Sequence, residues 1–273
     1  MKILVTGAKG MLGQDVCAFF REAGHLVIET DVENLDITNF NHSEYVIRYY
    51  APELLIHCAA YTNVDKAEED VENARLINSK GTENLAKIAS ERDIPIIYVS
   101  TDYVFDGEGC RPYLPTDCKN PLSVYGQTKS EGEDSIIKFC KKYYILRTSW
   151  LYGHKGKNFV ETIINLLKTK PEIKVVDDQM GCPTWTMELV SVMNKIIENK
   201  LEYGIYHACG SSYTTWHGFA QKIAEFIDSS TPVHPCTTEE FPRPAKRPRY
   251  SVMENFGLCR NWEEALKEYI EKR

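Results

Sequence analysis

The sequence predicts an α/β fold built on a doubly wound parallel sheet, with a smaller C-terminal lobe. Three features point to this class. Short β-rich runs alternate with helical segments over the first 150 residues, a glycine loop joins the first strand to the first helix, and the alternation loosens after Trp150. Such alternation is typical of a parallel sheet covered by helices on both faces. We therefore expect a core over residues 1–150 and a lobe over residues 151–273, some of whose elements return to the core.

Each core element has its own local signal. Strands are expected where β-branched and aromatic residues cluster in short runs, at residues 2–6, 25–30, 53–61, 94–100 and 143–150. Helices are expected over residues 11–24, 40–52 and 73–92, and over the segment that follows Pro121. Gly24 suits the end of a helix, Pro52 ends the second helix, and Pro121 suits the start of the last one.

The C-terminal part has a less regular pattern. Helices are expected over residues 157–168, 186–199 and 215–228, and short strands over residues 173–177 and 204–209. Residues 230–251 are rich in proline and charge, so we expect this segment to be mostly loop.

Composition restricts the partners and the compartment. The net charge of −7 argues against nucleic acid or an anionic membrane as the main partner. No apolar run approaches the ~20 residues of a membrane-spanning helix. Nine cysteines without a C-x-x-C pair are more consistent with reduced thiols than with disulfides or a zinc site. We therefore expect a cytoplasmic protein.

The segment TGAKGMLG places Gly7, Gly10 and Gly13 between the first expected strand and the first helix. Glycines there let the backbone approach a pyrophosphate, whose charge the helix N-terminus favours. Asp31 ends the second strand, roughly twenty residues further on, where a carboxylate accepts hydrogen bonds from an adenosine ribose. No arginine stands beside Asp31 to hold a 2′-phosphate. The pattern predicts a dinucleotide site that favours NAD(H), and NADP(H) stays open.

Other segments should meet the glycine loop at one edge of the sheet, because such folds bind ligands at the carboxyl ends of their strands. CAAYT follows the third strand, and its small Ala59 and Ala60 permit close passage of a cofactor. STDYVFDG follows the fourth strand with two hydroxyls and a carboxylate. Tyr125 and Lys129 lie four residues apart, hence on one face of a helix at the same edge. With a cofactor nearby, chemistry explains this pair better than packing does.

A phenol beside an ammonium group suits the reduction of a ketone, for which the nicotinamide supplies a hydride and the protein a proton. We expect Lys129 to favour the phenolate and to bring the pKa of Tyr125, ordinarily near 10, toward the working range. Lys129 is also expected to hydrogen-bond the nicotinamide ribose. The Thr101 hydroxyl is expected to bind the carbonyl oxygen and fix its direction.

Several segments resemble a known group of enzymes. TGAKGMLG, STDYVFDG and YGQTK resemble the extended short-chain dehydrogenase/reductase superfamily, which has a Rossmann-type core and a Y-x-x-x-K pair. AAYTNVDKAE, RTSWLYG, DDQMGCPT and RPAKRPRYS resemble, in the same order, segments of the dTDP-4-dehydrorhamnose reductase family. The resemblance covers essentially the whole chain.

The resemblance implies reduction of the C4 ketone of dTDP-4-dehydro-L-rhamnose to dTDP-L-rhamnose, so that a dTDP-sugar is the substrate. It implies that Thr101, Tyr125 and Lys129 form the catalytic set, and that Asp102 and Trp150 help to hold the sugar nucleotide. Asp36 would reach the adenine while Asp31 binds the ribose. Beside the glycines and the tyrosine–lysine pair, the residues at the family's dinucleotide contacts are Met11, Leu12, Asp36, Ile37, Ala59, Ala60 and Tyr61.

One concentrated basic segment contains Arg243, Lys246, Arg247 and Arg249. It is expected to bind the substrate diphosphate, with Arg247 as a ligand, because arginine pairs with phosphate through two parallel hydrogen bonds. A solvated basic loop is the alternative.

Some members of the family are described as dimers bridged by magnesium through acidic residues. Asp15 and Glu188 lie near the matching positions. The short side chain of Asp15 argues against that metal, so we assign no metal ligand. A homodimer stays open.

Three further classes of protein share the fold. A sugar-nucleotide 4,6-dehydratase typically needs an Asp-Glu pair after the threonine, but here Asp102 is followed by Tyr103. A sugar-nucleotide 4-epimerase keeps the tyrosine and lysine and retains its NAD through the cycle, yet STDYVFDG and RPAKRPRYS match the reductases better. A non-catalytic regulatory subunit would keep only the fold and partner surface, and the intact Thr101, Tyr125 and Lys129 argue against it.

Overall fold

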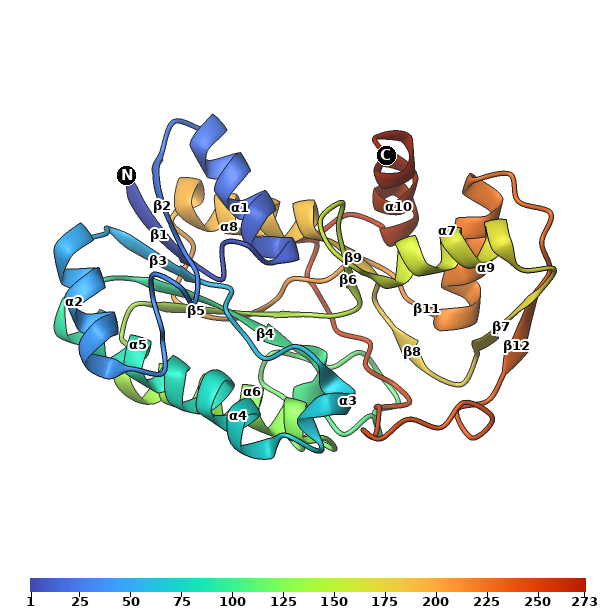
Figure 1. The fold of residues 1–273 in the computed structure, drawn as a ribbon, viewed down its shortest axis with the longest axis horizontal. Helices are drawn as coiled ribbons and strands as arrows, with labels where there is room; N and C mark the ends of the chain where they lie inside the picture. The colour runs from blue at the N-terminus through green and yellow to red at the C-terminus, as the bar shows by residue number, and fades with distance from the viewer.

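A six-stranded sheet forms the centre of the computed structural model, which describes all 273 residues (Figure 1). The strand order is β10-β5-β4-β3-β1-β2, and every pair is parallel. The strands are β1 (Lys2–Thr6), β2 (Leu26–Thr30), β3 (Leu54–His57), β4 (Ile96–Thr101), β5 (Tyr143–Thr148) and β10 (Gly204–His207).

Helices cover both faces of this sheet (Figure 1). One face carries α1 (Met11–Glu22) and α8 (Thr186–Asn199), and the other carries α2 (Phe40–Tyr50), α5 (Thr82–Glu91) and α6 (Val124–Phe139). Successive side chains of a strand point to opposite faces. Ile3 and Val5 accordingly join the core under α1 and α8, whereas Leu4 joins the core under α2 and α5. The predicted doubly wound α/β class is confirmed.

Two elements that follow residue 150 belong to the sheet layers. Helix α8 packs beside α1, and β10 extends the sheet next to β5, with Gly204 opposite Tyr144. Both elements were expected from the sequence as a helix and a strand, without a position in the fold. The domain boundary at residue 150 stays a prediction.

The other C-terminal elements form a smaller lobe beside the sheet (Figure 1). Its core joins three helices through buried residues that include Phe219, Trp262 and Leu266. No helix of the chain combines the length and apolar character needed to span a membrane. The lobe elements are α7 (Phe159–Thr169), α9 (Trp216–Phe226), α10 (Trp262–Glu271), the parallel pair β7 (Ile173–Val176) and β12 (Val233–Cys236), and the two-residue strands β6 (Leu151–Tyr152), β8 (Met180–Gly181), β9 (Thr184–Trp185) and β11 (Thr214–Thr215).

The helix expected over residues 73–92 is not regular. It consists of α4 (Val71–Arg75), a π-helical segment η1 (Leu76–Gly81) and α5. The Thr82 hydroxyl donates to the Asn78 carbonyl at 2.7 Å, and the Asn78 side chain hydrogen-bonds both backbone groups of Tyr61. Side-chain contacts that compete with the helical ladder are a recognised cause of such wide turns.

The C-terminal helix α10 was not predicted, although Asn261 followed by two glutamates is a helix-start signal. Residues 230–251 are mostly loop, as expected. Only Val233–Cys236 within them form a strand, β12, which pairs with β7.

Candidate active site

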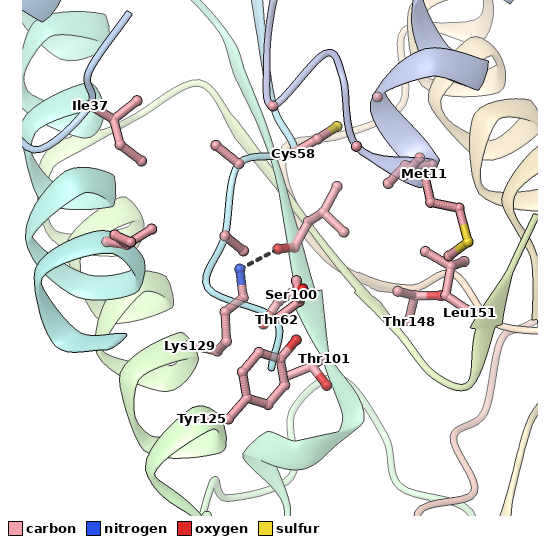
Figure 2. A pocket seen from close by; sticks show the side chains of 18 of the residues that line it. Met11, Ile37, Cys58, Thr62, Ser100, Thr101, Tyr125, Lys129, Thr148 and Leu151 are labelled. Carbon is pink, nitrogen blue, oxygen red and sulfur yellow. Dashed lines mark hydrogen bonds between the residues drawn. The ribbon is translucent and has the colours of Figure 1, made fainter. Parts of the chain in front are cut away.

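One cavity of about 1030 Å³ lies at the carboxyl ends of β1, β2, β3, β4 and β5 (Figure 2). Among the predicted site residues, Tyr61 and Arg247 do not line this cavity. The functional roles of all the predicted site residues stay predictions. The predicted site residues that line the cavity are Gly7, Gly10, Met11, Leu12, Gly13, Asp31, Asp36, Ile37, Ala59, Ala60, Thr101, Asp102, Tyr125, Lys129 and Trp150.

The glycine loop is packed too closely for side chains. Gly7 has φ +67°, and a Cβ on it would lie 2.7 Å from the Cα of Ala59. A Cβ on Gly13 would lie 2.1 Å from the Gly7 carbonyl oxygen. Gly10 precedes α1, whose N-terminus has neither a capping side chain nor an acidic residue in its first turn. Its free backbone N–H groups therefore suit an anion such as a pyrophosphate.

Asp31 and Asp36 are held by short local contacts. Asp31 accepts hydrogen bonds from the backbone N–H groups of Lys9 (3.0 Å) and Val32 (2.9 Å). Asp36 accepts from the backbone N–H (2.9 Å) and the hydroxyl (2.7 Å) of Thr38 through the same oxygen. Both carboxylates keep acceptor capacity, which suits the predicted roles at a ribose and a base.

Strand β4 ends in a short 3₁₀ helix, η2 (Asp102–Val104), which Thr101 caps. The Thr101 hydroxyl accepts from the backbone N–H of Tyr103 at 3.2 Å and donates to the Asp102 carboxylate at 3.1 Å. The second carboxylate oxygen of Asp102 is buried without a hydrogen-bond partner, and burial raises the pKa of Asp102 to about 6. Asp102 itself lines the cavity, as its predicted role at the sugar nucleotide requires.

Lys129 is almost fully buried and points toward the cavity from α6 (Figure 2). Its ammonium donates to the Val99 carbonyl at 2.7 Å and lies 4.1 Å from the centroid of the Tyr98 ring. Burial lowers the pKa of Lys129 to about 7, and the Glu133 carboxylate acts against that fall. The Lys129 side-chain amine is therefore only partly protonated near neutral pH.

The pKa of Tyr125 differs from the expectation. Burial of the phenol raises it to about 12, while a hydrogen bond with the Thr101 hydroxyl acts against the rise. The prediction that Lys129 lowers this pKa is wrong, because the ammonium is bonded to Val99 and desolvation dominates. The phenol is thus protonated at neutral pH, which is the state that can donate a proton to a ketone oxygen.

Trp150 has a left-handed backbone, with φ +47°, that non-glycine residues rarely adopt. Its indole stacks on Trp216 with ring centroids 3.6 Å apart and planes 7° apart. A Cβ on Gly181 would lie 2.5 Å from this indole, and the Trp216 ring N–H donates to Gln179 at 3.2 Å. The surrounding lobe thus fixes the Trp150 indole at the cavity, where it can pack against a sugar or a base.

The basic segment faces an acidic partner. Arg247 pairs with Asp65 of α3 (Val64–Ala67) through two contacts of 3.0 Å, and the backbone N–H of Ala245 donates to the same carboxylate at 3.3 Å. Sequence reasoning did not foresee this partner. The pair ties the C-terminal loop to the helix beside the cavity, and a role for Arg247 at the substrate diphosphate stays a prediction.

Asp15 and Glu188 form no metal site. Asp15 accepts from the Thr186 hydroxyl at 2.5 Å, and Glu188 accepts from Nε of Arg260 at 2.7 Å. No group of three or more His, Cys, Asp or Glu side chains in the chain is arranged to hold a metal ion. Magnesium, which the resemblance had left open, is therefore not supported, and the homodimer stays a prediction.

Several polar residues at the cavity were not foreseen from the sequence, and two of them are lysines. Lys9 lines the cavity from the glycine loop, and Lys157 lines it from the loop before α7. The Lys9 ammonium pairs with Glu33 at 2.7 Å. The signal for Lys9 was available in the sequence, because this lysine stands inside the glycine loop. Ser100, one of the two hydroxyls noted in STDYVFDG, also lines the cavity from β4.

An uncapped helix N-terminus that shares a cavity with the tyrosine–lysine pair of α6, on a doubly wound sheet, is the arrangement of an extended short-chain dehydrogenase/reductase. This class includes oxidoreductases that use a nicotinamide dinucleotide. Comparison with known proteins narrows the class, because the family described as RmlD substrate binding domain matches residues 1–273. The chain belongs to this family.

Relatives share the fold over its full length. The crystal structure of a dTDP-4-dehydrorhamnose reductase, an RfbD ortholog, from Clostridium acetobutylicum is 46% identical with a TM-score of 0.97, and the match covers 100% of this chain and 99% of that one. The dTDP-4-dehydrorhamnose reductase of Bacillus anthracis in complex with NADP is 37% identical with a TM-score of 0.96 and the same coverage. The spore coat polysaccharide biosynthesis protein SpsK of Bacillus subtilis is 38% identical over 100% of this chain and 98% of its own length.

Proposed function

We propose that this protein reduces the C4 ketone of dTDP-4-dehydro-L-rhamnose to dTDP-L-rhamnose, a nucleotide-sugar precursor of cell-surface polysaccharide. The observation that carries the proposal is the placement of the Tyr125 phenol, one helical turn from Lys129 on α6, in a cavity that it shares with Thr101 and the open N-terminus of α1. Full-length relatives named dTDP-4-dehydrorhamnose reductase support the choice of substrate. Residues 1–150 would bind the dinucleotide, and residues 151–273 mainly the sugar nucleotide.

The residues of the site fit a nicotinamide dinucleotide. The N–H groups at the start of α1 would hold its pyrophosphate, and Asp31 its adenosine ribose. Ala59 and Ala60 leave room for it beside the backbone. When bound, the reduced nicotinamide supplies the hydride.

The chain itself supplies orientation and a proton. The Thr101 hydroxyl binds the ketone oxygen and fixes its direction. The Tyr125 phenol gives its proton to that oxygen as negative charge develops there. The Lys129 ammonium would hydrogen-bond the nicotinamide ribose, and Asp102 and Trp150 would hold the sugar.

NADH should be at least as good a donor as NADPH. The Asp31 carboxylate at the cavity repels a 2′-phosphate. Lys9 lies next to Asp31, and its positive charge attracts a 2′-phosphate and so opposes this repulsion. The Lys9 ammonium is also paired with Glu33, but that ion pair is exposed to solvent and therefore weak. The test is steady-state kcat/KM for both donors, in the wild type and in Asp31→Asn, where we expect the ratio to shift toward NADPH.

Lys9→Met is the matched control for the donor test, because it should lower the use of NADPH and leave that of NADH nearly unchanged. A wild-type preference for NADPH above ~10-fold, equivalent to about 1.4 kcal/mol, would contradict the role given to Asp31.

With dTDP-4-dehydro-L-rhamnose, the protein should consume one reduced nicotinamide per sugar and release a product that keeps every oxygen. With dTDP-glucose and NAD it should do nothing. A dehydratase needs a base beside the threonine, and burial raises the pKa of Tyr103, which stands there, far above neutral pH. Mass spectrometry of both reactions gives the answer, and a 4-keto-6-deoxy product from dTDP-glucose would refute the assignment.

The same assay separates a reductase from an epimerase and from a regulatory subunit. A 4-epimerase would convert its sugar without net consumption of NADH or NADPH. A regulatory subunit would leave both donor and sugar unchanged. A panel of dTDP-, GDP- and UDP-linked ketosugars would define the base and the sugar.

The cytoplasm is the proposed compartment. All nine cysteines are free thiols, seven of them wholly or partly buried. Unpaired thiols in this number suit a reducing environment.

A further inference from the structure

Glu133 is a buried carboxylate that the chemistry above leaves unused. It lies on α6 one turn after Lys129 and two turns after Tyr125, and hence on the same face of the helix. Its side chain is 0% exposed, and that of its partner Arg147 on β5 is 2% exposed. Burying charges is costly even when they are paired, and an apolar pair often serves packing as well. The presence of this ion pair therefore requires an explanation other than packing.

The Glu133 carboxylate connects three elements at the edge of the site. Its Oε1 accepts from the Ser100 hydroxyl of β4 at 2.6 Å and from Nε of Arg147 at 2.9 Å. Its Oε2 accepts from Nη2 of Arg147 at 2.8 Å. Ser100 lines the cavity and directly precedes Thr101. One side chain thus joins the helix that carries Tyr125 to the strand end that carries Thr101.

The packing around Glu133 leaves α6 little room to move. A Cβ on Gly132 would lie 2.4 Å from the Tyr98 hydroxyl and 2.7 Å from the Asn78 carbonyl oxygen. On the other side, Nη1 of Arg147 donates to the Pro115 carbonyl at 3.1 Å. The helix is therefore in direct contact with β4, and the Glu133 hydrogen bonds set how its face aligns with that strand.

We propose that Glu133 is a positioning residue for the reduction: held by Arg147 and Ser100, it fixes the Tyr125–Lys129 face of α6 against the end of β4. This inference rests on the proposed function. Glu133 itself would contact neither the cofactor nor the substrate. It acts by setting the spacing between the Tyr125–Lys129 face of α6 and the end of β4, whose groups do contact them.

Glu133 also determines the charge around Lys129. The titratable groups that face the ammonium are Glu133 and Tyr125 of α6, Tyr98 of β4, and His57 and Cys58 at the end of β3. Burial lowers the pKa of His57 to about 3 and raises the pKa of Cys58 to about 12, so both are neutral at pH 7. Glu133 is thus the one carboxylate of this set. Without it, the pKa of Lys129 falls further and the ammonium is lost at lower pH.

The test compares Glu133→Gln with Glu133→Asp. Both should lower kcat by ~10-fold to ~10²-fold, the scale of a small misplacement of catalytic groups. In Glu133→Gln, the alkaline limb of the pH profile, which is the fall of kcat/KM at high pH, should also move to lower pH. In Glu133→Asp, which keeps the charge, this alkaline limb should stay near that of the wild type. A fluorescence titration with NADPH adds a second readout, and its Kd should rise in both variants.

Breaking a buried ion pair can unfold a protein, so the double variant Glu133→Gln/Arg147→Met removes both charges together. It should fold and still show the lower kcat and the shifted limb. Ser100→Ala keeps the ion pair, removes only the contact with β4, and should lower kcat as well. Ile136→Ala is the control, because Ile136 is a fully buried residue of the same helix outside these contacts. It should lower Tm without changing kcat, the limb or the NADPH Kd.

A folded Glu133→Gln or double variant with wild-type kcat, NADPH Kd and pH profile would overturn the inference. Losses of kcat and of NADPH affinity no larger than those of Ile136→Ala, at an equal decrease in Tm, would also overturn the inference. The NADPH titration needs no sugar. A wild type that binds NADPH but reduces no ketosugar therefore contradicts the proposed function, while the NADPH Kd of the Glu133 variants still tests the positioning role.

Discussion

Tyr125→Phe should lower kcat by ~10²-fold or more, the usual scale for loss of a general acid. The substitution removes the one hydroxyl that can give a proton to the ketone oxygen and keeps the aromatic ring that packs against Tyr103, with centroids 5.7 Å apart. The NADPH Kd should change little, because the substitution removes a single hydroxyl from the set of residues expected at the dinucleotide and leaves Lys129 in place. Single-turnover reduction of the ketosugar, followed by nicotinamide absorbance, measures the chemical step directly.

Tyr103→Phe is the matched control, since it removes a second phenol hydroxyl from the wall of the same cavity. Burial keeps that phenol protonated, and it has no assigned part in proton transfer. Its kcat should stay within a few-fold of the wild-type value. Near-normal turnover by Tyr125→Phe would refute the mechanism, and a large loss in Tyr103→Phe alone would move the acid to that residue.

Lys129→Met should damage both turnover and cofactor binding. A hydrogen bond to a charged group contributes about 1.5–3 kcal/mol, so the affinity for NAD(P)H should fall by ~10-fold to ~10²-fold, and kcat should fall with it. The wild-type pKa of about 7 adds a pH dependence. As the pH rises through neutrality the ammonium is lost, and the wild-type NADPH Kd should rise, whereas the Kd of Lys129→Met should stay flat. Fluorescence titrations over this range provide the measurement.

Lys138→Met is the control for Lys129→Met, because Lys138 is an exposed lysine in the last turn of the same helix. It should bind NADPH with wild-type affinity at every pH. Equal affinity of the wild type and Lys129→Met would show that Lys129 has no contact with the dinucleotide.

The parts of the site that could be predicted are those with local signals. Gly7 and Gly13 allow close backbone contact in a loop of fixed length, and Tyr125 and Lys129 share a helix face because they are four residues apart. Parallel strands bring their carboxyl ends to one edge, so the sequence also indicated that these segments meet. Each of these inferences depends on neighbours within a few positions of the chain.

The parts that could not be predicted depend on contacts between distant segments. The Lys129 ammonium bonds a carbonyl of β4, 30 positions earlier, so its direction was not visible from the helix. Arg247 pairs with Asp65, 182 positions away, and was therefore assigned to a phosphate. The raised pKa of Tyr125 results from burial, which requires the packed structure.

The place of β10 in the sheet has a consequence for synthesis. Strand β5 is an interior strand only because β10 pairs with it, and Gly204 comes 60 residues after its partner Tyr144. While the chain emerges from the ribosome, β5 therefore has one side without a partner, and an open strand edge is a site for pairing with other chains. The sheet that holds the dinucleotide cannot be completed by the first 150 residues. It closes only after residue 207 has been made, when α9, β12 and α10 of the lobe are still to be synthesised.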